Sequence, residues 1–203
     1  GGTFDPIHKG HVNIIEDLFD RVPIDELLLI PNGTPPHKKK LIPAEIKLEM
    51  VQLAIGHIDK LKIDDREIRK NSPSYSYETF KELKTENPTA DLIWIMGTDT
   101  FSNIETWFKY EKFLDEVNIL LLKRPGFGVD ENSFVNDLFK SKRIMKFSDF
   151  FGSTGNIFLL NINPIEITST EIRNLIRNEK NVTKFLNPEV HEVIKEYKLY
   201  ESK

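Results

Sequence analysis

Two histidines, His8 and His11, lie three positions apart in the opening stretch GGTFDPIHKGH. On the first turn of a helix, residues three apart share a face, so both imidazoles could point at one phosphate group. An imidazole there can donate a hydrogen bond to a phosphoryl oxygen whose charge rises in the transition state, and it needs no covalent chemistry. An isolated His-x-Gly-His pattern is as often a pair of capping or surface residues as it is a phosphate site, so it needs support from the residues around it.

That support comes from the residues before the histidines. Gly1 and Gly2 suit the glycine-rich turn that follows the first strand of an open α/β sheet, where backbone comes close to a bound phosphate. In such a sheet this first strand is central. We therefore expect an apolar run of about five to six residues, the usual strand length, upstream of Gly1.

A second anion-binding feature lies far along the chain. Thr168 and Glu171 have the T-x-x-E spacing of a capping box, which predicts that a helix begins here with backbone amides directed at a ligand. Arg173 then lies in the first turns, near such an anion. A lone helix arginine is usually solvated, and only the adjacent capping box favours a binding role.

The elements that must position these residues follow from hydrophobic periodicity. Short continuous apolar runs bounded by polar residues are typical of buried strands, and they occur at 26–30, 61–63, 91–97, 117–122 and 156–160. Helices are expected at 44–56, 76–86, 169–179 and 187–197. Strands that alternate with helices predict an α/β fold, a doubly wound, Rossmann-like parallel sheet with a C-terminal helical part.

Composition restricts the class of protein. The 203 residues suit one domain, 1–203, in which 126–155 reads as an insertion with a helix at 130–140. Cysteine is absent, which excludes disulfides and thiolate metal sites and fits a reducing cytoplasm. The net charge of −4 argues against a nucleic-acid binder. No apolar run is long enough for a membrane span.

Five stretches together resemble one family. They are GGTFDPIHKGH, PNGTPPHKK (31–39), DDREIRKNSPSYSYET (64–79), IMGTDTFSNIETWFKYE (95–111) and ITSTEIR (167–173). In this order they resemble the nicotinate-nucleotide adenylyltransferases, within the nucleotidyltransferases that carry the T/HxGH signature. Any one stretch alone would be weak evidence for the family, but the five together span most of the chain.

The resemblance implies an ATP site. It places the ATP phosphates between the histidines and the helix start after Thr168, and it assigns catalysis to His8, His11, Lys38 and Arg173. Lys38 is chosen from a lysine run because it directly follows PPH. The other ATP ligands implied are Gly1, Gly2, Thr3, Phe4, Thr168, Ser169 and Thr170. The family usually has Ser where Thr168 stands, which keeps the hydroxyl but leaves this side chain's role less defined.

The resemblance also implies a site for the mononucleotide. Asn32 would lie beside it, Asp99 follows a strand end, and Trp107 would stack on the pyridine ring. Ser76 begins a predicted helix, so backbone amides near Ser76 and Phe108 could receive the nicotinate carboxylate. A lone tryptophan is more often a core residue. The mixed segment that follows Trp107 favours a partly open ring. The charged residues at 64–69 are expected to form structural ion pairs.

The implied activity is transfer of the adenylyl group of ATP to nicotinate mononucleotide, in NAD biosynthesis, with Mg²⁺ bridging the polyphosphate. Three alternatives stay open. Pantetheine-phosphate adenylyltransferases share TFDPxHxGH but would not explain PPHK or the GTDT segment; class I aminoacyl-tRNA synthetases are longer; and a non-catalytic module of the same fold is the third. A homo-oligomer also stays open, since no sequence feature fixes the oligomeric state.

Overall fold

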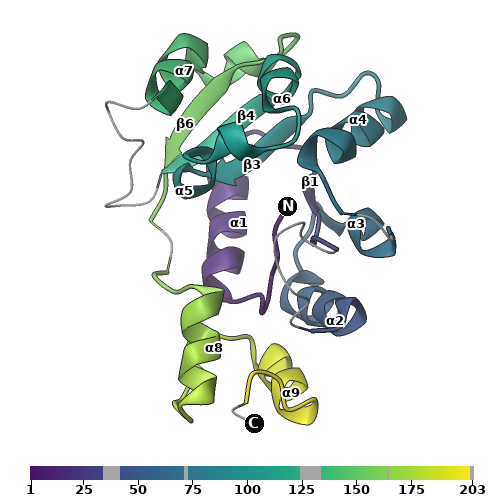
Figure 1. Cartoon of the computed structure of the whole chain (residues 1–203), viewed down its shortest axis with the longest axis vertical. Helices are drawn as coiled ribbons and strands as arrows, with labels where there is room; N and C mark the ends of the chain where they lie inside the picture. The colour runs from purple at the N-terminus through teal and green to yellow at the C-terminus, as the bar shows by residue number, and fades with distance from the viewer. Residues whose placement is uncertain (34–41, 71–72, 124–133, 164, 202–203) are drawn as a thin grey trace. The chain divides into compact units, whose positions relative to one another are not determined.

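The computed structural model describes residues 1–33, 42–70, 73–123, 134–163 and 165–201 (Figure 1). They form two compact units. The first consists of Gly1–Ser74 with Pro164–Lys203, and the second of Tyr75–Asn163. The single domain expected for 1–203, and the apolar strand expected upstream of it, stay predictions.

The first unit combines a short parallel sheet with helices from both ends of the chain. Strands β1 and β2 pair in parallel, with Leu27 opposite Leu61, and Gly2 forms a parallel bridge with Pro31 just beyond β1. The elements are α1 (Lys9–Arg21), β1 (Leu27–Leu29), α2 (Ala44–Ile55), β2 (Leu61–Ile63), α3 (Arg66–Arg69), α8 (Ser169–Arg177) and α9 (Pro188–Glu196).

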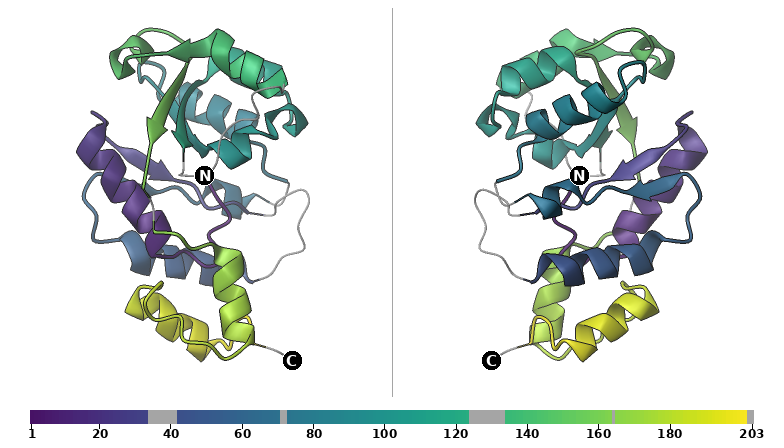
Figure 2. Two further views of the ribbon diagram at one scale, coloured as in Figure 1. Left: turned by 90° about the vertical axis from the view of Figure 1, so that its left-hand side faces the viewer. Right: turned by 90° about the vertical axis from the view of Figure 1, so that its right-hand side faces the viewer.

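Helices α2 and α9 pack against each other in this unit, and both views of Figure 2 show them side by side. The apolar residues of each helix recur every three or four positions, which gathers them on one face. On α2 the predicted face is confirmed, with Met50 and Val51 fully buried. On α9, Val190 is fully buried in the same core cluster. The C-terminal helical part is thereby anchored to the N-terminal half of the chain.

The second unit contains a four-stranded sheet of order β3-β4-β6-β5, in which every pairing is parallel. Parallel neighbours require crossover connections, and helices supply them. The elements are α4 (Ser76–Glu86), β3 (Ile93–Gly97), α5 (Thr98–Phe101), η1 (Ile104–Thr106), α6 (Tyr110–Glu116), β4 (Asn118–Lys123), α7 (Phe134–Lys142), β5 (Arg143–Ile144), η2 (Phe147–Phe150) and β6 (Ile157–Asn161).

The core of the second unit shows the period of two that strands impose. Ile119 and Leu121 on β4 are fully buried and lie in one cluster with Phe80 of α4, Phe113 of α6 and Phe139 of α7. The central strand β4 is buried along all but its last residue, which explains why its sequence is a continuous apolar run.

All five predicted strands are confirmed within a few residues, and the predicted helices correspond to α2, α4, α7, α8 and α9. Strand β5 was not predicted, because two residues carry no periodicity. It pairs with β6, so part of the expected insertion 126–155 forms an edge strand of the sheet.

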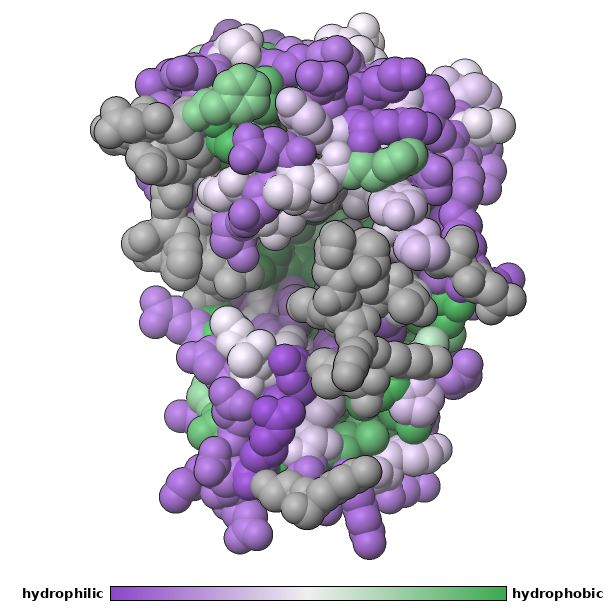
Figure 3. All heavy atoms as spheres, viewed as in Figure 1, coloured by the Kyte–Doolittle hydropathy of each residue, from purple (hydrophilic) through white to green (hydrophobic). Residues whose placement is uncertain are grey.

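None of the helices in the described part of the chain combines the length and apolar character needed to cross a membrane. On the face drawn in Figure 3, hydrophilic side chains predominate and hydrophobic ones appear in separate patches.

Candidate active site

The loop before α1 brings the two histidines together. His8 is the N-cap residue of α1, in an extended conformation, and His11 is the third residue of the helix. The backbone N–H of His8 donates to His11 Nδ1 at 3.3 Å, and the two ring centroids are 3.7 Å apart. The prediction that both rings lie together is confirmed, although His8 precedes the helix rather than lying on its first turn.

Gly10 explains the middle of the His-x-Gly-His pattern. A Cβ atom at this position would lie 3.0 Å from His8 Nδ1 and 3.0 Å from the carbonyl oxygen of Ile165. Such contacts are closer than packed atoms tolerate without moving. A side chain at position 10 would therefore displace the His8 ring or the segment that leads into α8.

The start of α8 is held by the predicted capping box. Glu171 N donates to Thr168 Oγ1 at 3.1 Å, and Thr168 N donates to Glu171 Oε2 at 2.7 Å. This fixes the direction of the first turn of the helix.

The first turns of α8 meet the loop that carries the histidines. Ser169 Oγ donates to the Pro6 carbonyl oxygen at 2.9 Å, and Arg173 Nη1 donates to the Asp5 carbonyl oxygen at 2.6 Å. Arg173 Nη2 also donates to Thr170 Oγ1. Two segments more than 160 positions apart are thus joined through the Asp5 and Pro6 backbone. Together they carry imidazole, hydroxyl and guanidinium groups, a donor set that suits phosphate oxygens. We call these residues the histidine cluster: His8, His11, Ser169, Thr170 and Arg173.

Asn32 lies beside the opening glycines. Its backbone N–H donates to the Gly2 carbonyl oxygen at 2.8 Å, and Gly2 N donates to the Ile30 carbonyl oxygen at 3.1 Å. The Asn32 carbonyl oxygen accepts a hydrogen bond from the ammonium group of Lys47, a buried residue of α2. Lys47 was not predicted as a site residue, because a lysine on an apolar helix face gives no local signal.

The second unit holds most of the residues predicted to bind the mononucleotide. Ser76 is the first residue of α4, as predicted. The ring of Tyr75, which precedes it, packs on the ring of Phe108 with centroids 4.6 Å apart. Trp107 is half-buried against Phe113, and Phe108 is exposed. The amide-rich start of α4 and the Trp107–Phe108 segment are therefore neighbours within this unit.

Asp99 lies in the first turn of α5, immediately after β3, and its side chain is exposed. Its Oδ1 atom would be 2.3 Å from a Cβ at position 97, so a side chain there would require the Asp99 carboxyl group to move. The strand end predicted at Gly97 is confirmed.

A tie between α4 and α6 orients the start of α4. Tyr77 Oη donates to Glu116 Oε1 at 2.8 Å, and Lys81 Nζ donates to Glu116 Oε2 at 3.0 Å. The hydrogen bond from Lys81 lowers the pKa of the Glu116 carboxyl, and the bond to Glu116 raises the pKa of the Tyr77 hydroxyl. Since Tyr77 follows Ser76 directly, this tie holds the first turn of α4 against α6.

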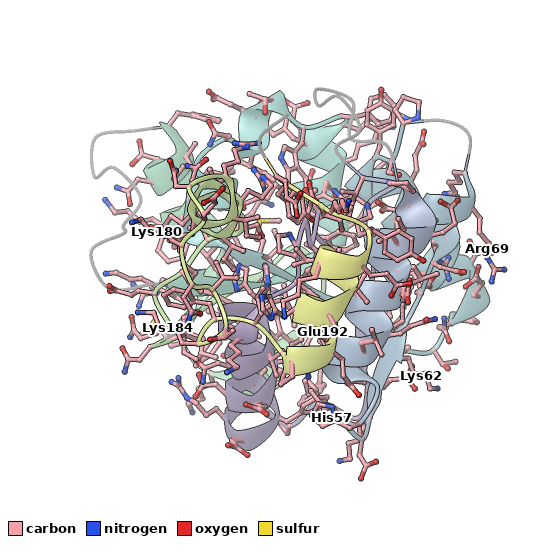
Figure 4. All side chains as sticks on the ribbon, turned by 90° about the horizontal axis from the view of Figure 1, so that it is seen from below. His57, Lys62, Arg69, Lys180, Lys184 and Glu192 are labelled. Carbon is pink, nitrogen blue, oxygen red and sulfur yellow. The ribbon has the colours of Figure 1, made fainter. Side chains whose placement is uncertain are left out.

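The charge cluster at 64–69 is structural, as predicted. Arg66 pairs with Asp64 at 2.8 Å, and Arg69 pairs with Asp65 at 2.9 Å. Arg69, labelled in Figure 4, lies at the edge of the molecule in that view.

Lys38, predicted to be catalytic, lies outside the described residues.

A hollow of about 460 Å³ lies between the end of α8 and α9 and includes Lys180, labelled in Figure 4. None of the predicted site residues lines it. The candidate site is therefore the histidine cluster and not this hollow.

The comparisons with known proteins decide the family. The cytidylyltransferase-like family model matches residues 1–175. A probable nicotinate-nucleotide adenylyltransferase of Clostridium tetani is 34% identical, covering 98% of this chain and 96% of the relative. One from Shewanella frigidimarina is 33% identical, with 98% and 97% covered. The chain belongs to the nicotinate-nucleotide adenylyltransferase family.

Solved structures agree on the fold of this nucleotidyltransferase family. A nicotinic acid mononucleotide adenylyltransferase of Plasmodium falciparum, complexed with NaAD, has a TM-score of 0.75 at 21% identity, with 98% of this chain and 94% of that chain covered. The Rossmann-like α/β class predicted from the sequence is confirmed.

Sequence patterns missed a contact that holds the loop before the histidines. The Asp5 side chain is buried and accepts a hydrogen bond from Tyr200 Oη at 2.6 Å. The two residues are 195 positions apart, and a tyrosine near the end of the chain has no spacing or motif that links it to the opening loop.

Proposed function

We propose that this member of the nicotinate-nucleotide adenylyltransferase family transfers the adenylyl group of ATP to nicotinate mononucleotide. A phosphate oxygen of the mononucleotide attacks the α-phosphorus of ATP, a new P–O bond forms, and the bond to the β-phosphate oxygen breaks. Pyrophosphate leaves and the deamido dinucleotide precursor of NAD is the product. The observation that carries the proposal is the His8–His11 pair, on a loop bound to the capped start of α8, in a chain that matches a curated member of this family over 98% of its residues.

The protein's part is alignment and charge neutralisation, because the substrate phosphate is already a nucleophile. His8 and His11 would donate to phosphoryl oxygens, and Arg173 would add a fixed positive charge beside them. Lys38, Gly1, Gly2, Thr3, Phe4, Thr168, Ser169 and Thr170 complete the proposed ATP ligands.

The proposed magnesium ion arrives with ATP. The groups gathered beside the histidines are imidazole, hydroxyl and guanidinium, which suit phosphate oxygens better than a hard cation. Mg²⁺ would thus be held chiefly by the polyphosphate, whose negative charge it would neutralise. The proposal places the reaction in the cytoplasm, which the absence of cysteine from the sequence permits.

The acid group of the substrate would be read by backbone amides near Ser76 and Phe108. A nicotinamide group there would direct its NH₂ donors at N–H donors, leaving unpaired groups that cost ~1 to 3 kcal/mol each. Two such mismatches predict a preference for the acid of about a hundredfold or more in kcat/KM.

The test is pyrophosphate release from ATP with four acceptors: nicotinate mononucleotide, nicotinamide mononucleotide, phosphopantetheine and none. We expect release with the first and about a hundredfold lower kcat/KM with the second. Preference for phosphopantetheine would favour the pantetheine-phosphate alternative, and no release with any acceptor would favour a binding module.

A further inference from the structure

The chain after α9 turns back so that Tyr200 reaches the opening loop of the protein. Lys198 and Tyr200 both adopt left-handed backbone conformations, with φ of 48° and 65°. These conformations are unfavourable for residues other than glycine. Leu199 between them is buried in the core of the first unit. The Lys198 conformation belongs to the cap of α9, in which Leu199 N donates to the Ile194 carbonyl oxygen at 2.9 Å and Lys198 N donates to the Lys195 carbonyl oxygen at 3.1 Å. This cap turns the chain back at the end of α9.

The Tyr200 side chain makes one of those contacts. Its hydroxyl donates to Asp5 Oδ1 at 2.6 Å, and the Asp5 side chain is only 3% exposed. A hydrogen bond from a hydroxyl to a buried carboxylate is short and strong. Burial and the neighbouring Asp5 raise the pKa of the Tyr200 hydroxyl, so the group stays protonated and keeps donating.

Asp5 lies in the loop at residues 4–8 that leads to the two histidines, which we call the histidine loop. It follows Phe4, a buried residue with φ of 46°, and it precedes Pro6, whose carbonyl oxygen accepts from Ser169. The Asp5 main chain is bound to Arg173 while its side chain is bound to Tyr200.

Asp5 thus holds the loop in two ways. Its carbonyl oxygen binds Arg173 of α8, and its side chain binds Tyr200 of the C-terminal segment. The Phe4 ring in turn packs edge-on against His11, with centroids 5.1 Å apart. A shift of Asp5 would therefore move Phe4, and with it the His11 ring that Phe4 contacts. It would also move His8, which follows Asp5 by three residues in the chain.

We propose that Tyr200 is a positioning residue for the histidine pair: its hydrogen bond to Asp5 holds the loop at residues 4–8 in the conformation that presents His8 and His11 to the phosphates. The kinetic consequence rests on the proposed function. Tyr200 touches neither substrate; it acts through Asp5.

The test compares Tyr200→Phe with the matched control Tyr197→Phe, which removes a hydroxyl from an exposed ring in the same segment. Small displacements of aligned groups cost large factors in rate, so Tyr200→Phe should lower kcat about tenfold or more. KM for both substrates should change by less than about threefold, because ground-state binding does not use this bond. Tyr197→Phe should match the wild type. A Tyr200→Phe kcat equal to that of Tyr197→Phe would overturn the proposal.

A readout without substrates separates positioning from the proposed function. Backbone amide exchange over 4–11 should be faster in Tyr200→Phe than in Tyr197→Phe, while exchange over β4 in the second unit should be unchanged. If the wild type released no pyrophosphate, the proposed function would fail, and this exchange measurement alone would decide the positioning role. Unchanged exchange over 4–11 would contradict it.

Replacements of Asp5 complete the design. Asp5→Asn keeps an oxygen that can accept from Tyr200, whereas Asp5→Ala removes it. We expect Asp5→Asn to retain more of the wild-type kcat than Asp5→Ala. Combining Asp5→Ala with Tyr200→Phe should add little to the loss of Asp5→Ala alone, because both remove the same bond. Fully additive losses would show that the two residues act independently. Should Tyr200→Phe fail to fold, wild-type kcat in Asp5→Ala would overturn the proposal.

Discussion

At the scale of single residues, the histidine pair depends on a small number of close contacts. The ring of His8 is buried, that of His11 is partly open, and Gly10 leaves room between His8 and the Ile165 backbone. This arrangement gives the two imidazoles unequal surroundings.

Replacing His8 or His11 by Ala should lower kcat by about a hundredfold, because one lost donor to a developing phosphoryl charge costs on the order of 3 kcal/mol. Binding of nicotinate mononucleotide should weaken far less. Steady-state kinetics with His57→Ala as control would check this, since His57 is exposed and lies in a turn after α2 (Figure 4). Wild-type turnover in either active-site variant would contradict the catalytic assignment.

Trp107 makes a separate prediction about selectivity. Its half-buried ring can stack on a pyridine whether the substrate carries an acid or an amide. Trp107→Ala should lower kcat/KM for both mononucleotides by similar factors, so that the ratio of the two kcat/KM values changes less than about threefold. Kinetics with the two substrates would measure it. Loss of the preference for the acid in Trp107→Ala would show that the tryptophan itself reads the carboxylate.

At the scale of elements, the start of α8 is fixed both by its local sequence and by contacts with residues far away in the chain. Its capping box fixes the first turn, and that turn carries Ser169 and Arg173 toward the histidine loop. A helix that began one residue later would turn these side chains by about 100°, given 3.6 residues per turn. The cap is therefore a condition for the site as well as for the stability of the helix.

Thr168→Ala should lower the free energy of unfolding by about 1 kcal/mol through loss of the N-cap, and Thr168→Ser should retain most of it. The control is Thr85→Ala on α4, where the hydroxyl only bonds back to the Lys81 carbonyl oxygen within the helix. Chemical denaturation would give the three values. Equal stability of Thr168→Ala and Thr85→Ala would show that the capping box contributes nothing measurable.

At the scale of the whole molecule, the predicted ligands divide between the two units. The histidine cluster and Asn32 belong to the first, whereas Ser76, Asp99, Trp107 and Phe108 belong to the second. Each unit builds its own core, from cluster residues such as Met50 in one and Phe113 in the other.

Removal of Mg²⁺ should act on the reaction as a whole. A chelator should abolish pyrophosphate release, because the proposed reaction relies on the cation to neutralise most of the polyphosphate charge. Added Mg²⁺ should restore it, and the midpoint of thermal unfolding without ATP should be the same in both conditions. Undiminished turnover in excess chelator would contradict the proposed cofactor.

Much of this protein is determined by its sequence alone, because the signals involved are local. Short continuous apolar runs located strands such as β4, period-3.6 hydrophobicity located helices such as α2, and T-x-x-E located the start of α8. Only tertiary structure decided that Arg173 and Ser169 bind the Asp5–Pro6 backbone, that Tyr75 packs on Phe108, and that Tyr200 reaches Asp5. Those contacts join residues from 33 to 195 positions apart, and the free energy that selects them is gained only when buried surfaces meet, so no local pattern records them.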